Sequence, residues 1–110
     1  MGEQKENLAL TEGVYYILLA LWEPLHGYGI MQRATAMSGG RVNLAAGTLY
    51  GALNTLLEKG WIEAQPGEEA SRRKEYRITG LGKTAVENEV HRLEELLQNG
   101  RSVMEGGNKE

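Results

Sequence analysis

A run of nine nonpolar residues, Val14 to Trp22, most constrains how this chain can fold. It lies in LALTEGVYYILLALWE (8–23), which predicts a helix, and Pro24 ends it because the residue before a proline disfavours helical backbone. A helix on the surface of a domain has a polar face, and this stretch has none. We therefore expect it to be buried on both sides, one against its own domain and the other against a second partner.

The rest of the chain predicts two further helices, a hairpin and a last helix. HGYGIMQRATAMSGG (26–40) predicts a short helix, and Asn43 is the expected N-cap of a helix over 44–59 that ends at Gly60. WIEAQ (61–65) and RKEYRI (73–78) predict two strands, and Thr79 is the expected cap of a helix over 80–99. A helix-turn-helix followed by a hairpin is the winged-helix arrangement, so we expect a mainly α fold with a small β-hairpin.

The helix expected over 44–59 carries two glycines, each costing about 1 kcal/mol relative to alanine. On a helical wheel one face is apolar, with Leu49, Ala52, Leu53, Leu56 and Leu57. The opposite face holds Gly47, Gly51, Asn54 and Glu58, flanked by Thr48, Thr55 and Tyr50. Such a nearly bare face can approach a DNA major groove closely and bond there through Asn54, the threonines and the Tyr50 hydroxyl. The alternative is that the glycines let another helix pack closely.

Positive charge is concentrated in the middle of the chain. Residues 26–78 hold seven basic and five acidic side chains, although the whole chain has a net charge of −3. Arg72, Arg73 and Lys74 follow each other where the hairpin tip returns into a strand, which suits contacts with phosphates. The alternative is a solvated charge run paired with Glu68 and Glu69.

Several classes of function are excluded by composition. The chain has no cysteine and no aspartate, which removes thiolate sites and most magnesium-dependent phosphoryl transfer. Gly82-Lys83-Thr84 ends like a phosphate-binding loop, but Arg77 stands where that loop needs a glycine. His26 and His91 have no spacing that makes a metal or catalytic set. We therefore expect no enzyme activity, no cofactor and no metal, and a cytoplasmic protein without a membrane segment.

The last helix carries a short heptad pattern. Val86, Val90, Leu93 and Leu97 are spaced four, three and four residues apart, too few for a coiled coil alone. This pattern and the unpartnered side of the first helix both predict a homodimer, with intramolecular packing of the two helices as the alternative. The expected interface is Tyr15, Leu18, Trp22, Val86, Val90, Leu93 and Leu97. The expected organisation is a flexible arm (1–7), a winged helix-turn-helix domain (8–79), a dimerisation helix (80–99) and a disordered tail (100–110).

The motifs HGYGIMQ, GTLYGALNTLLEKGWI and RRKEYRITGLGK resemble those of the PadR-like family of winged-helix transcriptional regulators, from about Leu10 to Gly100. The resemblance implies a dimeric DNA-binding repressor of the short type with one dimerisation helix. By position it places Tyr28, Gly47, Thr48 and Tyr50 near DNA, and Arg72, Arg73 and Lys74 on the basic wing.

Two departures from the family pattern matter. Many members have proline where this chain has Gly51, which puts the base contacts of the helix in doubt. Multidrug-binding members stack flat aromatic ligands on a tryptophan of the last helix, whereas residues 81–99 here contain no aromatic residue. A small aromatic effector at the dimer interface would have to use Tyr15, Tyr16 or Trp22.

Together these observations predict a homodimeric, sequence-specific DNA-binding repressor of an inverted-repeat operator. The expected DNA-binding residues are Tyr28, Gly47, Thr48, Tyr50, Gly51, Asn54, Arg72, Arg73 and Lys74. The alternative is a winged helix used as a protein-interaction module without DNA binding, which the acidic total charge allows.

Overall fold

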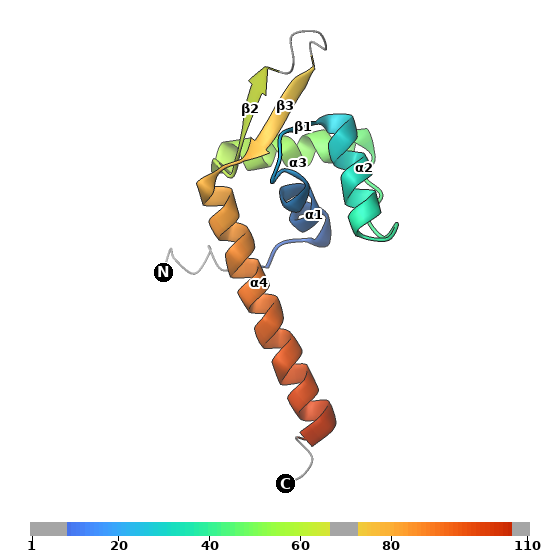
Figure 1. Cartoon of the computed structure of the whole chain (residues 1–110), viewed down its shortest axis with the longest axis vertical. Coiled ribbons are helices and arrows are strands. Elements are labelled where there is room, and N and C mark those ends of the chain that lie inside the picture. The colour runs from blue at the N-terminus through green and yellow to red at the C-terminus, as the bar shows by residue number, and fades with distance from the viewer. Residues whose placement is uncertain (1–8, 67–72, 107–110) are drawn as a thin grey trace.

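The computed structural model describes residues 9–66 and 73–106. Its elements, in chain order, are α1 (Glu12–Ala20), β1 (Leu25–His26), α2 (Gly27–Met37), α3 (Ala46–Lys59), β2 (Ile62–Pro66), β3 (Lys74–Ile78), α4 (Gly80–Arg101) and a π-helical turn (Ser102–Gly106). The three short helices gather beside a small sheet, and α4 leaves this body as a long projecting rod (Figure 1). This is the winged-helix fold that the sequence predicts.

The core lies where the helices meet the sheet and the first turns of α4. Its most completely buried large side chains come from α1 and the residue after it, from α2 and from α3: Ile17, Leu18, Leu21, Ile30, Leu49, Leu53 and Leu56. Thr11 caps α1 by accepting a hydrogen bond from the Val14 amide at 3.1 Å, so α1 is shorter than the segment 8–23. Ala20 is also buried, whereas the other nonpolar residues of α1, including Tyr15 and Tyr16, are half-buried.

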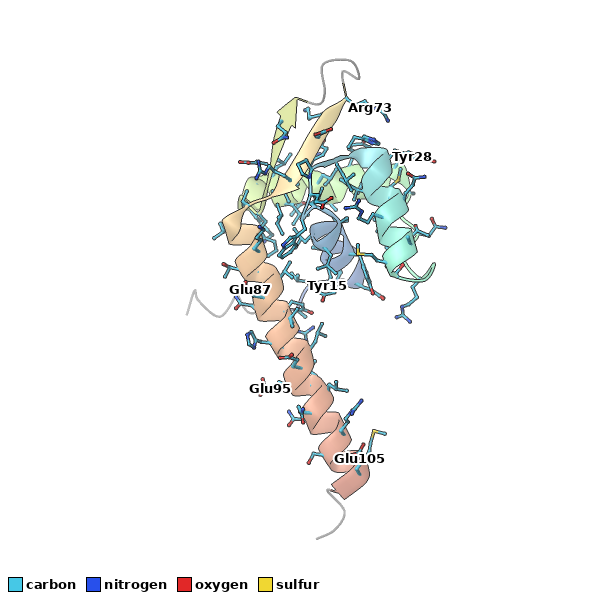
Figure 2. The ribbon with its side chains drawn as sticks, in the orientation of Figure 1. Tyr15, Tyr28, Arg73, Glu87, Glu95 and Glu105 are labelled. Atoms are coloured by element: carbon cyan, nitrogen blue, oxygen red, sulfur yellow. The ribbon has the colours of Figure 1, made fainter. Side chains whose placement is uncertain are left out.

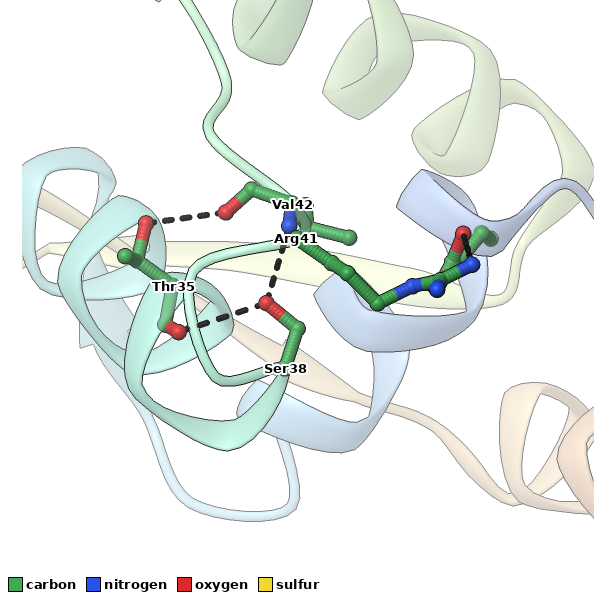
Figure 3. Close-up of polar contacts among 5 residues, drawn as sticks. Thr35, Ser38, Arg41 and Val42 are labelled. Carbon is green, nitrogen blue, oxygen red and sulfur yellow. Dashed lines mark hydrogen bonds and ion pairs between the residues drawn. The ribbon is translucent and has the colours of Figure 1, made fainter.

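The turn between α2 and α3 is held by a small hydrogen-bond network (Figure 3). The Thr35 hydroxyl donates to the Val42 carbonyl at 3.0 Å, and the Val42 amide donates to the Ser38 hydroxyl at 2.9 Å. Gly39 and Gly40 adopt positive φ angles of 64° and 89°, which allow the sharp reversal after α2. Arg41 leaves the turn toward α1 and pairs with Glu12 at 2.8 Å. These contacts fix α2 and α3 relative to each other and to α1.

The first turn of α3 differs from the expectation. The helix begins at Ala46 with Ala45 as its N-cap, and it has no side-chain cap. The prediction that Asn43 caps it is wrong because the backbone is still extended at Ala45, so the helix begins three residues beyond Asn43. The other end is as predicted: Gly60 ends the helix in the left-handed region with φ of 76°.

The sheet has three strands rather than the two of the predicted hairpin. Its order is β1-β3-β2, with β3 antiparallel to both neighbours. In β1, Leu25 pairs with Tyr76 and His26 with Glu75, which joins the start of α2 to the wing. Two residues are too few to give a strand periodicity, so the sequence pattern does not reveal β1.

The start of α4 packs tightly against the start of β2. The Thr79 amide donates to the Trp61 carbonyl at 2.9 Å, and the Thr79 side chain accepts from the Gly82 amide at 3.1 Å as the predicted cap. A methyl group at Gly82 would overlap the Trp61 carbonyl oxygen. The glycine of the rejected phosphate-loop motif is therefore needed for this close approach.

The helical end of the chain extends further than predicted. α4 runs to Arg101 instead of residue 99, and Ser102–Gly106 continue it as a π-helical turn, so the predicted disorder of 100–106 is wrong. Once nucleated, a long helix adds residues at little cost, which outweighs the low helix propensity of Gly100. The predicted arm (1–7) and residues 107–110 of the predicted tail lie outside the described residues.

Candidate nucleic-acid interface

The outer face of α3 is open to solvent, as the helical wheel predicts. Gly47, Gly51, Asn54 and both flanking threonines are exposed, while Leu49, Leu53 and Leu56 bury the opposite face in the core. Nothing lies within 4 Å of the position that a Cβ atom would take at Gly47 or at Gly51. Close packing of another helix of the described chain therefore does not explain these glycines.

The beginning of α3 is suited to an anion. Because Ala45 provides no capping oxygen, the first amides of α3 receive no side-chain bond from the N-cap. The helix dipole adds partial positive charge at the same place. A phosphate brought to this end would be bound by these N–H groups.

Two of the three predicted wing cations fall in the described part of the chain. Lys74 begins β3 and is exposed, and Arg73, just before it, is also exposed. Arg72 lies outside the described residues. Lower on the wing, Arg77 of β3 pairs with Glu63 of β2 at 3.7 Å, so that cation is partly neutralised by its cross-strand neighbour.

Tyr28 lies in the first turn of α2 and is 57% exposed. Figure 2 shows Tyr28 and Arg73 at the same end of the molecule, opposite the free end of α4. The His26 side chain caps this helix by accepting from the Gly29 amide at 3.2 Å. A histidine is an uncommon cap, so the sequence pattern does not predict this role for His26.

Tyr50 is less free than the helical wheel suggests. It is 45% exposed, yet its ring leans on the first residue of α2, where a methyl group at Gly27 would overlap the Tyr50 hydroxyl. Burial raises the pKa of Tyr76, and the neighbouring Tyr50 raises it further. Tyr50 therefore lies at the junction of α2, α3 and the wing.

The residues expected at a dimer interface divide into two groups. Trp22, Val90, Leu93 and Leu97 are between 36% and 53% exposed, and Tyr15 is half-buried. Leu18 and Val86 are 0% and 3% exposed because they pack into the core of the single chain, so including them in an interface was wrong. The exposed group continues along α4 with Leu96 and, in the π-helical turn, with Val103 and Met104.

Glu89 is buried, although the heptad pattern places it among the outer, polar positions of α4. It is 5% exposed and holds Arg92 through both carboxylate oxygens, at 3.0 and 2.6 Å. It also accepts from the Leu10 amide at 3.3 Å, which ties the segment before α1 to α4. The Arg92 hydrogen bonds hold the pKa of Glu89 below its ordinary value, against the effect of burial. An i, i+3 Glu–Arg pair was the sequence signal for this contact.

A groove of about 990 Å³ separates the start of α1 from α3 and α4. Its floor includes Leu10, Val14, Leu56 and Trp61. The three aromatic residues expected to serve an effector, Tyr15, Tyr16 and Trp22, do not line it. Trp22 instead lies under the Lys83 ammonium, 5.3 Å from the ring centre. The described residues contain no cluster of three side chains that could hold a metal ion.

An open helix face, an uncapped helix start and exposed cations on the wing are features of winged-helix proteins of the class that binds duplex DNA. The chain belongs to the PadR-like family of transcriptional regulators, which matches residues 15–88. The family is one of transcriptional regulators, and its match covers α2, α3 and the wing described above. Within the described residues, no helix has the length and apolar character needed to cross a bilayer.

Some known proteins have a similar sequence or the same fold. An uncharacterized 37.1 kDa protein in transposon TN4556 of Streptomyces fradiae is 38% identical over 81 residues, which are 73% of this chain and 22% of that protein. The chain thus spans about a fifth of that relative. A transcriptional regulator from Clostridium thermocellum has the same fold, with TM-score 0.69, 24% identity and coverage of 83% and 87% of the two chains. A PadR family transcriptional regulator from Eggerthella lenta also has this fold, with TM-score 0.69, 24% identity and coverage of 84% of this chain and 81% of that chain.

Proposed function

We propose that this regulator is a cytoplasmic, homodimeric repressor that binds an inverted-repeat operator. The observation that carries the proposal is the outer face of α3, where Gly47 and Gly51 stand in open space beside Asn54. An exposed helix face without bulky side chains lets the backbone enter a major groove deeply. Thr48 and Asn54 then reach base edges.

The surroundings of α3 support phosphate contacts on both sides of the groove. Lys74 and Arg73 extend from the wing, Arg72 belongs to the same basic run, and Tyr28 extends from α2. Phosphate contacts fix the register of the protein on the duplex, and base contacts give the sequence preference. Bound to an operator, such a dimer represses by occupying the DNA.

The homodimer is supported by the free part of α4. From Leu93 to Glu105 every residue is exposed, including Leu93, Leu96 and Leu97 at 40%, 52% and 53%. A helix with an apolar strip gains stability when a second copy covers it. Tyr15 in α1 and Trp22 just after it offer further apolar surface.

The test is selection of duplexes from a random pool, followed by titration of the selected duplex at two salt concentrations. We expect an enriched inverted repeat and an affinity that falls steeply with salt, because bound phosphates release counterions. If no sequence is enriched and no duplex is retained, the chain is a protein-interaction module, a function that its net charge of −3 allows.

A further inference from the structure

We infer that Tyr50 is a positioning residue: its side chain holds the start of α2 and the wing in place against α3, and it does not itself contact DNA. This inference deepens the proposed function and rests on it. It departs from the sequence-based expectation, in which the Tyr50 hydroxyl bonds to DNA.

The Tyr50 side chain packs closely against Gly27. A Cβ atom at Gly27 would overlap the Tyr50 hydroxyl and come within 2.8 Å of the ring carbon that bears it. Gly27 is itself buried, so the far end of the Tyr50 ring is packed on the backbone of α2. A hydroxyl packed on another helix is poorly placed to enter a groove.

Tyr50 is also close to a buried residue of the wing, Tyr76. Tyr76 of β3 is 7% exposed and is close enough to Tyr50 for the two phenols to influence each other, since Tyr50 adds to the rise of the Tyr76 pKa caused by burial. Tyr76 also pairs with Leu25 of β1, two residues before Gly27. Tyr50 therefore packs on Gly27 next to a strand pair that joins the wing to α2.

The elements that meet near Tyr50 also carry residues that we propose to contact DNA. Gly27 precedes Tyr28, which is 57% exposed, and β3 begins at Lys74. A shift of Tyr50 would move the first turn of α2 and the wing relative to the open face of α3. DNA contacts made from three elements lose affinity when their spacing changes, although no contacting atom has been removed.

The experiment compares four variants with the parent protein. The probe is the duplex that the parent selects from a random pool, and the variants are Tyr50→Phe, Tyr50→Ala, Gly27→Ala and the double variant Gly27→Ala/Tyr50→Ala. Gly13→Ala is the matched control, because a methyl group there makes only an ordinary contact with Leu44. Thermal unfolding is recorded for each protein.

Tyr50→Phe keeps the ring and should bind within about twofold of the parent, and the control should do the same. Gly27→Ala should weaken binding about tenfold by displacing the ring, with an unchanged salt slope because no phosphate contact is lost. In the Tyr50→Ala background, Gly27→Ala should add no further loss. That non-additivity is the signature of positioning through Tyr50.

Three results would overturn the inference alone: a tenfold loss in Tyr50→Phe, no loss in Gly27→Ala, or equal losses from Gly27→Ala in both backgrounds. If Gly27→Ala does not fold, the Tyr50→Phe titration decides between hydroxyl contact and positioning. A parent protein that selects no duplex overturns the proposed function and this inference with it.

Discussion

At the scale of single residues, Gly47 and Gly51 destabilise α3, and no contact within the described chain offsets this loss of stability. Each lowers helix stability by about 1 kcal/mol relative to alanine, and each stands in open space. Their benefit must therefore lie in what approaches the helix from outside. This reasoning leads to a test in which stability and DNA binding move in opposite directions.

We predict that Gly51→Leu folds more stably than the parent but binds DNA poorly. Leucine favours the helix by up to about 1 kcal/mol, and nothing lies within 4 Å of the position that its Cβ atom would take. In a groove the same side chain would hold the backbone away from the bases, with a loss of affinity of tenfold or more. Thermal melting and titration with the selected duplex measure the two effects.

The control for this variant is Glu58→Leu, two turns along the same face at the end of α3, which should leave sequence-specific binding largely intact. A Gly51→Leu protein that is stable and binds as tightly as the parent would contradict the account of α3 as the groove-binding helix. A marked loss of stability would instead indicate a packing partner for this face.

We also predict that Glu89 contributes stability that depends on pH. Its folded pKa is lowered, first by the hydrogen bonds from Arg92, so the folded protein binds this proton less readily than the unfolded chain does. The contribution is therefore fully present above the ordinary value of 4.5 and is lost as the pH falls through the lowered value. Chemical unfolding from about pH 6 to about pH 3 should show a shallower fall in stability for Glu89→Gln than for the parent.

The Glu89→Gln variant should still lose stability in acid, because Arg41 also lowers the pKa of Glu12. The comparison therefore uses Glu87→Gln, which removes an exposed carboxylate from the same helix and should keep the slope of the parent. Identical pH profiles for Glu89→Gln and the parent would show that the buried pair does not couple to folding.

At the scale of elements, the wing holds its cations at a defined place, where we expect them to contact DNA phosphates. Its base is fixed by β1 on one side and by the contact of Thr79 with Trp61 on the other. Its exposed cations then act from a defined place, although no base-reading geometry is required of them. Their effect on binding should be electrostatic.

We predict that Lys74→Ala or Arg73→Ala weakens binding by a similar factor for all duplex sequences. Each lost phosphate contact should reduce the slope of log affinity against log salt by about one. Lys83→Ala is the matched control, since the Lys83 ammonium lies over the Trp22 ring and is not part of the basic run of the wing. A change of preference at one base pair with an unchanged slope would mean that the wing residue contacts bases.

Sequence patterns predicted the elements that have a strong period or a local end signal. The apolar face of α3, the Gly60 stop and the Thr79 cap are all of this kind, because each depends on residues within one or two turns. Contacts between distant segments left no such signal. β1 exists only because β3 lies beside it, and Glu89 is buried only because the chain at Leu10 folds against α4.

The same limit explains the errors within the candidate site. The heptad pattern grouped Val86 with Val90, but the core of the domain reaches only as far as the first turns of α4 and covers Val86 alone. Likewise the wheel of α3 placed Tyr50 on an outer flank, and only the path of α2 brings Gly27 under its ring. The spacing of residues along a helix predicts the direction in which a side chain points, but it does not predict which residue of another element lies there.

At the scale of the whole molecule, the shape is a compact body with a long helical rod. The rod beyond Arg92 touches little of its own chain, which explains its uniform exposure (Figure 1). Exposed apolar residues follow each other along α4 (Val90, Leu93 and Leu97) and the π-helical turn (Val103 and Met104). A second copy offers the same strip, so a two-fold pair would cover both.

We predict that Val90→Glu/Leu93→Glu yields a folded monomer. The two side chains are 36% and 40% exposed in the single chain, so glutamates there should be tolerated by the fold. In a dimer they would bury charge without a partner, which is costly. Sedimentation should show a monomer with the helical content of the parent, and Gln98→Glu/Asn99→Glu, with the same added charge on another side of α4, should remain dimeric.

The last prediction connects the dimer to the DNA. A two-fold pair presents two copies of α3 related by the same axis, so the bound sequence should be an inverted repeat with half-sites about 34 Å, one helical turn, or a multiple of it apart. Footprinting of the parent should protect both half-sites together. Val90→Glu/Leu93→Glu should protect them only at much higher concentration and independently of each other, because a monomer keeps its α3 but loses the second one. A parent footprint over a single unrepeated site, or equal protection by the monomeric variant, would contradict the coupling of α4 to operator recognition.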